Sequence, residues 1–169
     1  MLKFMRREWY FLKIIYKTII YNSMKNATKA TKALEAYAAL MNNIQIIEGL
    51  CNKVDSAGKI VELDGATAAD SQIADVLDDI QLVLTANSNS GAGTYTQATA
   101  KYTVNADSYI SNSATNAVEI ASLDFSNFLD AGAVKWATIS VDDAVFLANL
   151  SELKVSLGQF RDSVSSFIV

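Results

Sequence analysis

A strict heptad repeat of large apolar residues runs through the last thirty residues of the chain, 140–169. Successive members are alternately four and three residues apart: Phe146, Leu150, Leu153, Leu157, Phe160, Val164 and Phe167. On an α-helix this spacing puts all of them on one narrow edge, which is unfavourable in water until a second helix covers it. Ser140 and Asp143 can cap its start, since the hydroxyl can accept an amide N–H and the carboxylate suits the positive helix end. We therefore predict a C-terminal helix that pairs lengthwise with another helix.

The partner that we predict for it lies between residues 25 and 54. Apolar residues step by three and four there as well, with Ala30 and Ala33 followed by larger side chains up to Val54. We expect the two helices to form a coiled coil through which copies of the chain also associate. Cys51, the single cysteine, lies on the same stripe and is predicted to be a buried apolar residue rather than a reactive thiol. The residues of this predicted contact, called the terminal seam below, are Tyr37, Leu40, Ile44, Ile47, Phe146, Leu150, Leu153, Leu157, Phe160, Val164 and Phe167.

The middle of the chain is predicted to complete a bundle. A helix that Asp70 caps has an apolar face and ends near residue 87, and residues 87–93 (NSNSGAG) form an exposed loop. Residues 95–122 are predicted to be helical because tyrosines recur there every seven residues. Strand is the competing interpretation, because Thr and Tyr alternate in places.

The predicted fold class follows from these elements and from the absence of Pro, which leaves nothing to force a break in a long helix. We predict an all-α helical bundle in which long N- and C-terminal heptad helices pair as a coiled coil. Residues 59–63, bracketed by two glycines, can add one short β element. Residues 24–169 would form this single helical domain.

Residues 1–23 form a separate basic and aromatic segment. On a helix, Lys3, Arg6, Arg7, Lys13 and Lys17 share one side, and aromatic and aliphatic residues occupy the rest. The segment is too short and too charged to span a bilayer. The face that would meet a membrane or a partner contains Arg6, Trp9, Lys13 and Lys17.

Three interpretations of this segment stay open. It can lie on an anionic membrane, pack on the protein's own acidic body or a neighbouring subunit, or be a non-native leader ahead of a start at Met24. Charge is strongly divided along the chain: residues 1–32 hold eight basic and one acidic side chain, and residues 33–169 hold six basic and seventeen acidic ones. The two parts attract each other, or an anionic partner.

Few residues suggest chemistry. The chain has no His, which removes the commonest general base and transition-metal ligand. The carboxylates between Glu62 and Asp79 match no calcium loop, and Asp75 and Asp79 are expected on a solvated helix face. No phosphate-binding loop or nucleophile elbow is present. We therefore predict no enzyme activity, no cofactor or metal, no small-molecule substrate and no nucleic-acid partner.

Two terminal heptad helices around a polar middle, in a chain without Pro or His, resemble the plan of the filament-forming axial proteins of bacterial type III secretion and flagellar systems. Residues 30–54 and 146–167 stand where translocator filament proteins and flagellin place their paired helices. The chain departs from them in its basic, aromatic N-terminus, since those proteins begin with a polar export signal. The resemblance carries over no individual residue.

The resemblance implies a structural subunit of an extracellular or cell-surface filament whose partner is itself. One alternative is a membrane-associated or pore-forming helical protein that acts through its basic N-terminal helix. Another is a soluble helical adaptor or chaperone, which would be cytoplasmic.

Overall fold

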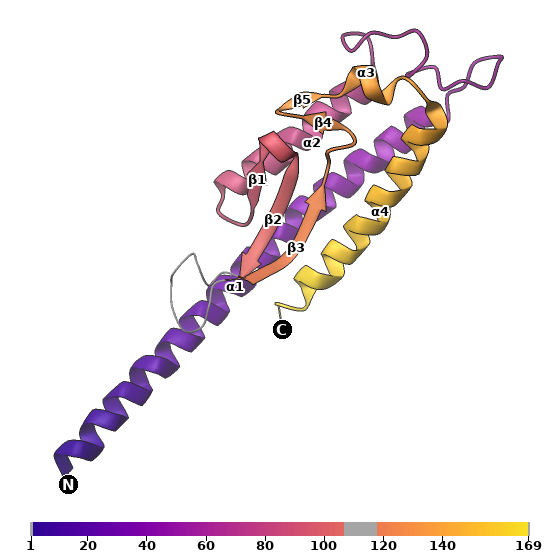
Figure 1. Ribbon diagram of the computed structural model, residues 1–169. Helices are drawn as coiled ribbons and strands as arrows, with labels where there is room; N and C mark the ends of the chain where they lie inside the picture. The colour runs from indigo at the N-terminus through magenta and orange to yellow at the C-terminus, as the bar shows by residue number, and fades with distance from the viewer. Residues whose placement is uncertain (1, 107–117, 169) are drawn as a thin grey trace.

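The computed structural model describes residues 2–106 and 118–168, without the side chains of residues 2–6, 18–19 and 21–23 (Figure 1). Three helices longer than one turn stand out in these ranges: α1 (Leu2–Cys51), α2 (Gln72–Asn89) and α4 (Asp143–Ser165). The remaining elements are β1 (Thr94–Thr96), the 3₁₀ turn η1 (Gln97–Thr99), β2 (Lys101–Ala106), β3 (Val118–Asp124), β4 (Leu129–Asp130), β5 (Ala133–Val134) and the short helix α3 (Trp136–Ile139).

The predicted all-α fold class is wrong, because the fold is mixed α/β. An antiparallel three-stranded sheet in the order β1-β2-β3 packs against the helices: β3 contacts α4, β2 contacts α1, and β1 contacts α2. A second antiparallel pair joins β4 to β5. The C-terminal half of α1 also contacts α2 and α4, so the core lies between these three helices and the sheet (Figure 1).

The helix predicted over residues 95–122 is wrong, because the sequence also has the alternating pattern of a strand. Along β2 the side chains of Tyr102, Val104 and Ala106 are buried, and those between them are more exposed, which is the two-residue period of a strand. Tyr95 and Tyr102 are direct cross-strand partners, so the seven-residue spacing between them reflects a hairpin and not two turns of a helix. The third tyrosine of the row, Tyr109, lies outside the described residues.

The short β element predicted at 59–63 is present only as one antiparallel bridge between Val54 and Ile60. The carboxylate of Asp55 closes the turn between them by accepting the backbone N–H groups of Ala57 and Lys59 at 2.8 and 2.9 Å. The predicted exposed loop at 87–93 is shorter than expected, because α2 continues to Asn89.

Both helix caps differ from the prediction by one or two residues. Ser71, rather than Asp70, caps α2 by accepting the N–H of Ala74. Asp142 caps α4 by accepting the N–H groups of Ala144 and Val145. Ser140 instead donates its hydroxyl to the carbonyl of Trp136 at the end of α3.

Helix α1 is continuous across residue 23, where the sequence changes in composition. Neither Pro nor Gly occurs between residues 2 and 48, so no residue there favours a break. The structure therefore joins the basic N-terminal segment and the first heptad helix into one helix of 50 residues.

Candidate self-association surface

The terminal seam lies inside one chain. Within α1, Leu40, Ile44 and Ile47 are fully buried, and Tyr37 packs against the same core. Six members on α4 are buried as well, and Phe167, just beyond the helix, is half-buried. The two helices contact each other along this core, and Lys154 on α4 pairs with Glu48 on α1 at 2.8 Å.

The apolar edge of α4 also meets the sheet. The ring of Phe160 lies 5.9 Å from that of Tyr102 on β2, and Phe146 meets Phe128 edge to face at 5.7 Å. The core residues of the seam therefore have almost no exposed area left to give to another copy. Any surface for self-association has to be found elsewhere on the molecule.

The first part of α1, residues 2–23, extends away from the rest of the protein and is called the projecting segment below (Figure 1). Every side chain described between residues 7 and 20 is exposed, and the first buried residue among the described side chains of α1 is Asn26. The large apolar side chains there are 40 to 70% exposed: Trp9, Tyr10, Phe11, Leu12, Ile14, Ile15, Tyr16 and Ile20. Eight exposed large apolar side chains on one stretch of helix mark an interaction site.

The residues predicted to face a membrane or a partner lie on this segment. Trp9, Lys13 and Lys17 are all exposed, and the ammonium group of Lys13 sits 4.0 Å from the centroid of the Trp9 ring. That cation–π contact keeps a positive charge beside an exposed apolar surface. The side chain of Arg6 lies outside those described. Five basic residues and one acidic residue give the projecting segment a net positive charge.

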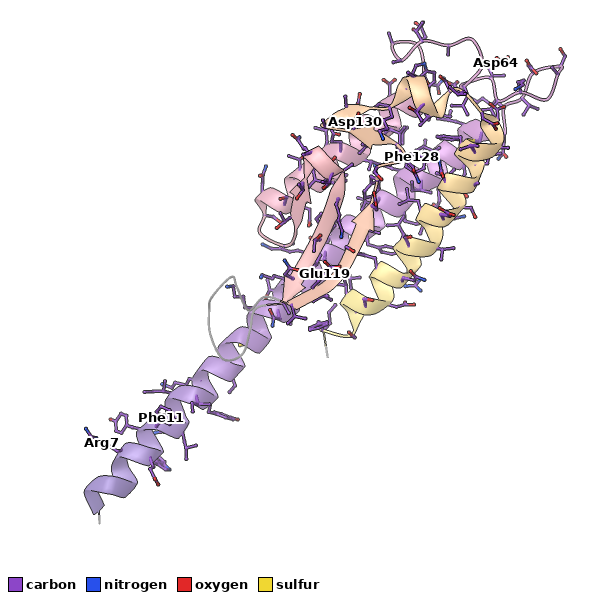
Figure 2. The ribbon with its side chains drawn as sticks, viewed as in Figure 1. Arg7, Phe11, Asp64, Glu119, Phe128 and Asp130 are labelled. Atoms are coloured by element: carbon purple, nitrogen blue, oxygen red, sulfur yellow. The ribbon has the colours of Figure 1, made fainter. Side chains whose placement is uncertain are left out.

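The opposite end of the molecule is acidic. Residues 48–71 and 140–155, which meet there, hold eight acidic and three basic side chains. Figure 2 shows Arg7 and Phe11 on the projecting segment and Asp64 at the far end of the molecule. The two ends therefore carry opposite charge and attract each other when two copies approach end to end.

A hollow of about 490 Å³ lies at this acidic end between the last turn of α1 and the first half of α4. We call it the α1–α4 groove. Leu147 and Val155 on its walls are 44% and 60% exposed, so apolar surface is open to solvent inside it. Its lining residues are Glu48, Cys51, Asn52, Leu147, Leu150, Ser151, Lys154 and Val155.

The pKa of Cys51 reflects its burial and the negative charge around the groove. Burial, together with the nearby carboxylates of Asp143 and Glu48, raises the pKa of the Cys51 thiol from 9.0 to about 11. A thiol with this pKa stays protonated and is a poor nucleophile at neutral pH. Cys51 therefore contributes packing rather than chemistry, as its place on the helical stripe predicted.

The acidic residues of α2 do not form a metal site. Asp75, Asp78 and Asp79 are exposed on its outer face, and among the described residues no group of three His, Cys, Asp or Glu side chains could hold a metal ion. Partial burial raises the pKa of Asp78, and its two neighbouring carboxylates raise it further. This is the solvated face that the spacing predicted.

The α1–α4 groove was not predicted from the sequence. Leu147, Ser151 and Val155 follow one another at four-residue intervals beside the heptad edge of α4. This interval places them on one face of α4 and was the only sequence signal for the groove. The signal is weak, because two apolar residues on a solvated helix face are common. They form a groove only because the end of α1 lies next to them.

Comparison of the chain with protein-family models, with curated proteins and with solved structures finds no match. The arrangement itself defines the class: a mixed α/β body from which half of one long helix projects. In the part of the chain that the structure describes, no helix has the length and apolar character needed to cross a membrane.

Proposed function

We propose that this protein is a structural subunit that assembles with copies of itself into a filament, with the projecting segment buried in the assembly. The single observation that carries the proposal is the row of exposed large apolar side chains between Trp9 and Ile20. Burying one such side chain from this exposure stabilises a contact by about 1–2 kcal/mol. Eight of them on one rigid helix favour a protein partner over water.

The partner we favour is a second copy. The projecting segment is basic and most of the remaining chain is acidic, so two copies complement each other in charge as well as in apolar surface. A contact between two different surfaces of the same protein does not close by itself, and it produces open filaments when the rotation between copies does not form a ring.

Attachment to an anionic membrane is the second candidate, and the pairing of Trp9 with Lys13 favours it, because both side chains suit the headgroup region. Glu8 argues against it. This exposed carboxylate precedes Phe11 and Leu12 by three and four residues, so it lies on the apolar side of the segment, where lipid would have to accept a charge.

Substitution on the projecting segment tests the proposal. Leu12→Glu combined with Tyr16→Glu places charge on an exposed surface without touching the core, so the variant should fold normally and form no filaments. Leu82→Glu combined with Val118→Glu is the matched control, since these side chains on α2 and β3 are 67% and 66% exposed. Electron microscopy and analytical ultracentrifugation over a range of concentrations provide the measurement.

Long polymers formed by the wild-type protein and the control, but not by the first variant, would support the proposal. A single small particle of the wild-type protein at every concentration would refute it. Flotation with anionic vesicles identifies the second candidate, which predicts lipid binding by the wild-type protein and none by the variant with two glutamates in the projecting segment.

A further inference from the structure

We propose that the projecting segment of one copy docks in the α1–α4 groove of the next copy, in a head-to-tail contact. This inference rests on the proposed function and names the surface that receives the segment. Three properties of the two surfaces match: their apolar character, their charge and their positions on the molecule.

The apolar match concerns what each surface exposes. The segment offers Trp9, Leu12 and Tyr16 on one side of its helix, where spacings of three and four residues place them together beside Lys13. The groove offers Leu147 and Val155, which are one face of α4 that nothing in the described chain covers. A helix laid along a groove between two other helices buries its apolar side in this way.

The charge match concerns the surroundings of the groove. Asp143 and Glu48 both act on the thiol of Cys51, so their carboxylates lie close to it. Glu152 follows the lining residue Ser151 on α4, Asp142 precedes α4, and both carboxylates are exposed. Lys154, the one cation in the lining, is already paired with Glu48. The face of the segment formed by Trp9, Leu12 and Tyr16, which has Lys13 beside it, therefore enters a surrounding of opposite charge.

The position match concerns the axis of α1. The centre of the segment near residue 13 and the groove near residue 49 lie on the same straight helix, about 54 Å apart at about 1.5 Å per residue. When the helices of two copies run parallel, docking leaves a free segment at one end and a free groove at the other. Each added copy repeats the contact, and the chain of copies grows without closing.

Disulfide cross-linking of the full chain tests this contact. In a Cys51→Ala background, Leu12→Cys and Val155→Cys place one thiol on the segment and one in the groove. Mild oxidation of the double variant should give a ladder of dimers, trimers and larger species on a non-reducing gel. A mixture of the two single variants should stop at dimers, and each single variant alone should give monomers. Thermal unfolding of every variant confirms that it folds.

Two outcomes would overturn the contact and one would overturn the filament. Efficient dimers of the Leu12→Cys variant alone would show that segments bundle with one another, and polymers of the double variant without any ladder would show that another surface receives them. Both leave self-assembly intact. A double variant that cross-links fully but stops at dimers would keep the docking and refute the filament, because antiparallel copies would then close on each other.

Salt provides a second readout of the same contact. Raising the ionic strength screens attraction between exposed charges, so the protein concentration needed for cross-linking of the double variant should increase severalfold. A concentration requirement that does not change with salt would contradict the role given to the acidic end.

Discussion

Replacing Leu157 by Ala is the sharpest test of the terminal seam. Leu157 lies in α4 and has no exposed area, within the cluster that joins α4 to α1 and the sheet. Substitution of a buried Leu by Ala removes apolar contacts and leaves a cavity, at a cost of about 2–5 kcal/mol. We expect about 3 kcal/mol here, which lowers the melting temperature of a chain of this size by roughly 6–12 °C.

Val155→Ala on the same helix is the matched control. Its side chain is 60% exposed and two residues away, so its loss should change the free energy of unfolding by no more than about 0.5 kcal/mol. Urea denaturation followed by circular dichroism measures both variants, at two protein concentrations. Identical midpoints at the two concentrations show that folding is measured free of assembly.

The comparison can fail in a way that refutes the reasoning. A Leu157→Ala variant within about 0.5 kcal/mol of the Val155→Ala variant would mean that the heptad edge of α4 is not the interior of the fold. The pairing of α1 with α4, and the argument that self-association must use another surface, would then both be wrong.

Three further predictions concern local features. Burial and the carboxylates of Asp143 and Glu48 raise the pKa of Cys51 to about 11 in the folded protein, so the unfolded chain loses this proton at lower pH. The free energy of unfolding should therefore fall as pH rises from about 9 to 11. The urea midpoint of Cys51→Ala should lack this part of the fall. Gly93→Ala should destabilise the fold by about 1–3 kcal/mol in thermal unfolding, because its new Cβ would lie 2.5 Å from the ring of Tyr102. Gly49→Ala should instead stabilise the fold by about 1 kcal/mol in the same assay, because Gly49 is a helical residue of α1 and its new Cβ would meet no atom beyond the adjoining residues of the helix within 4 Å. Asp142→Ala should cost about 1 kcal/mol by removing the cap of α4, and a melting temperature equal to that of the wild type would contradict the cap.

The helices could be predicted because their apolar residues follow the helical period over many turns. Leu150, Leu153 and Leu157 are each weak evidence alone, but the repeat around them has one simple structural solution. The same periodicity marked Leu40 and Ile44, and the structure buries them all. Long and regular patterns of this kind predict a helix whatever tertiary contacts form around it.

Strand was only the competing interpretation of residues 95–122, because the strand signal is short and coincides with a longer helical pattern. Tyr95 and Tyr102 are seven residues apart, which fits a helix, yet they lie opposite each other in a hairpin. Strands of three to seven residues offer only two or three alternations each, too few to outweigh a longer pattern.

One of the two surfaces of the candidate site could be predicted from the sequence, and the other could not. The projecting segment is visible in the sequence as a basic, apolar helix around Trp9 and Lys13, because that property belongs to one stretch of chain. The α1–α4 groove joins Glu48 to Leu147, which are about a hundred residues apart. No local pattern reports their proximity, so the groove could be found only from the fold.

The continuity of α1 has a mechanical consequence. A single helix with neither Pro nor Gly across the boundary between body and projecting segment contains no residue that favours a sharp kink there, so the segment keeps one direction relative to the body. The angle at which two copies join is therefore fixed before they meet, and every joint in a polymer would have the same bend and twist. Stiffness and a uniform pitch would come from the backbone hydrogen bonds of one helix.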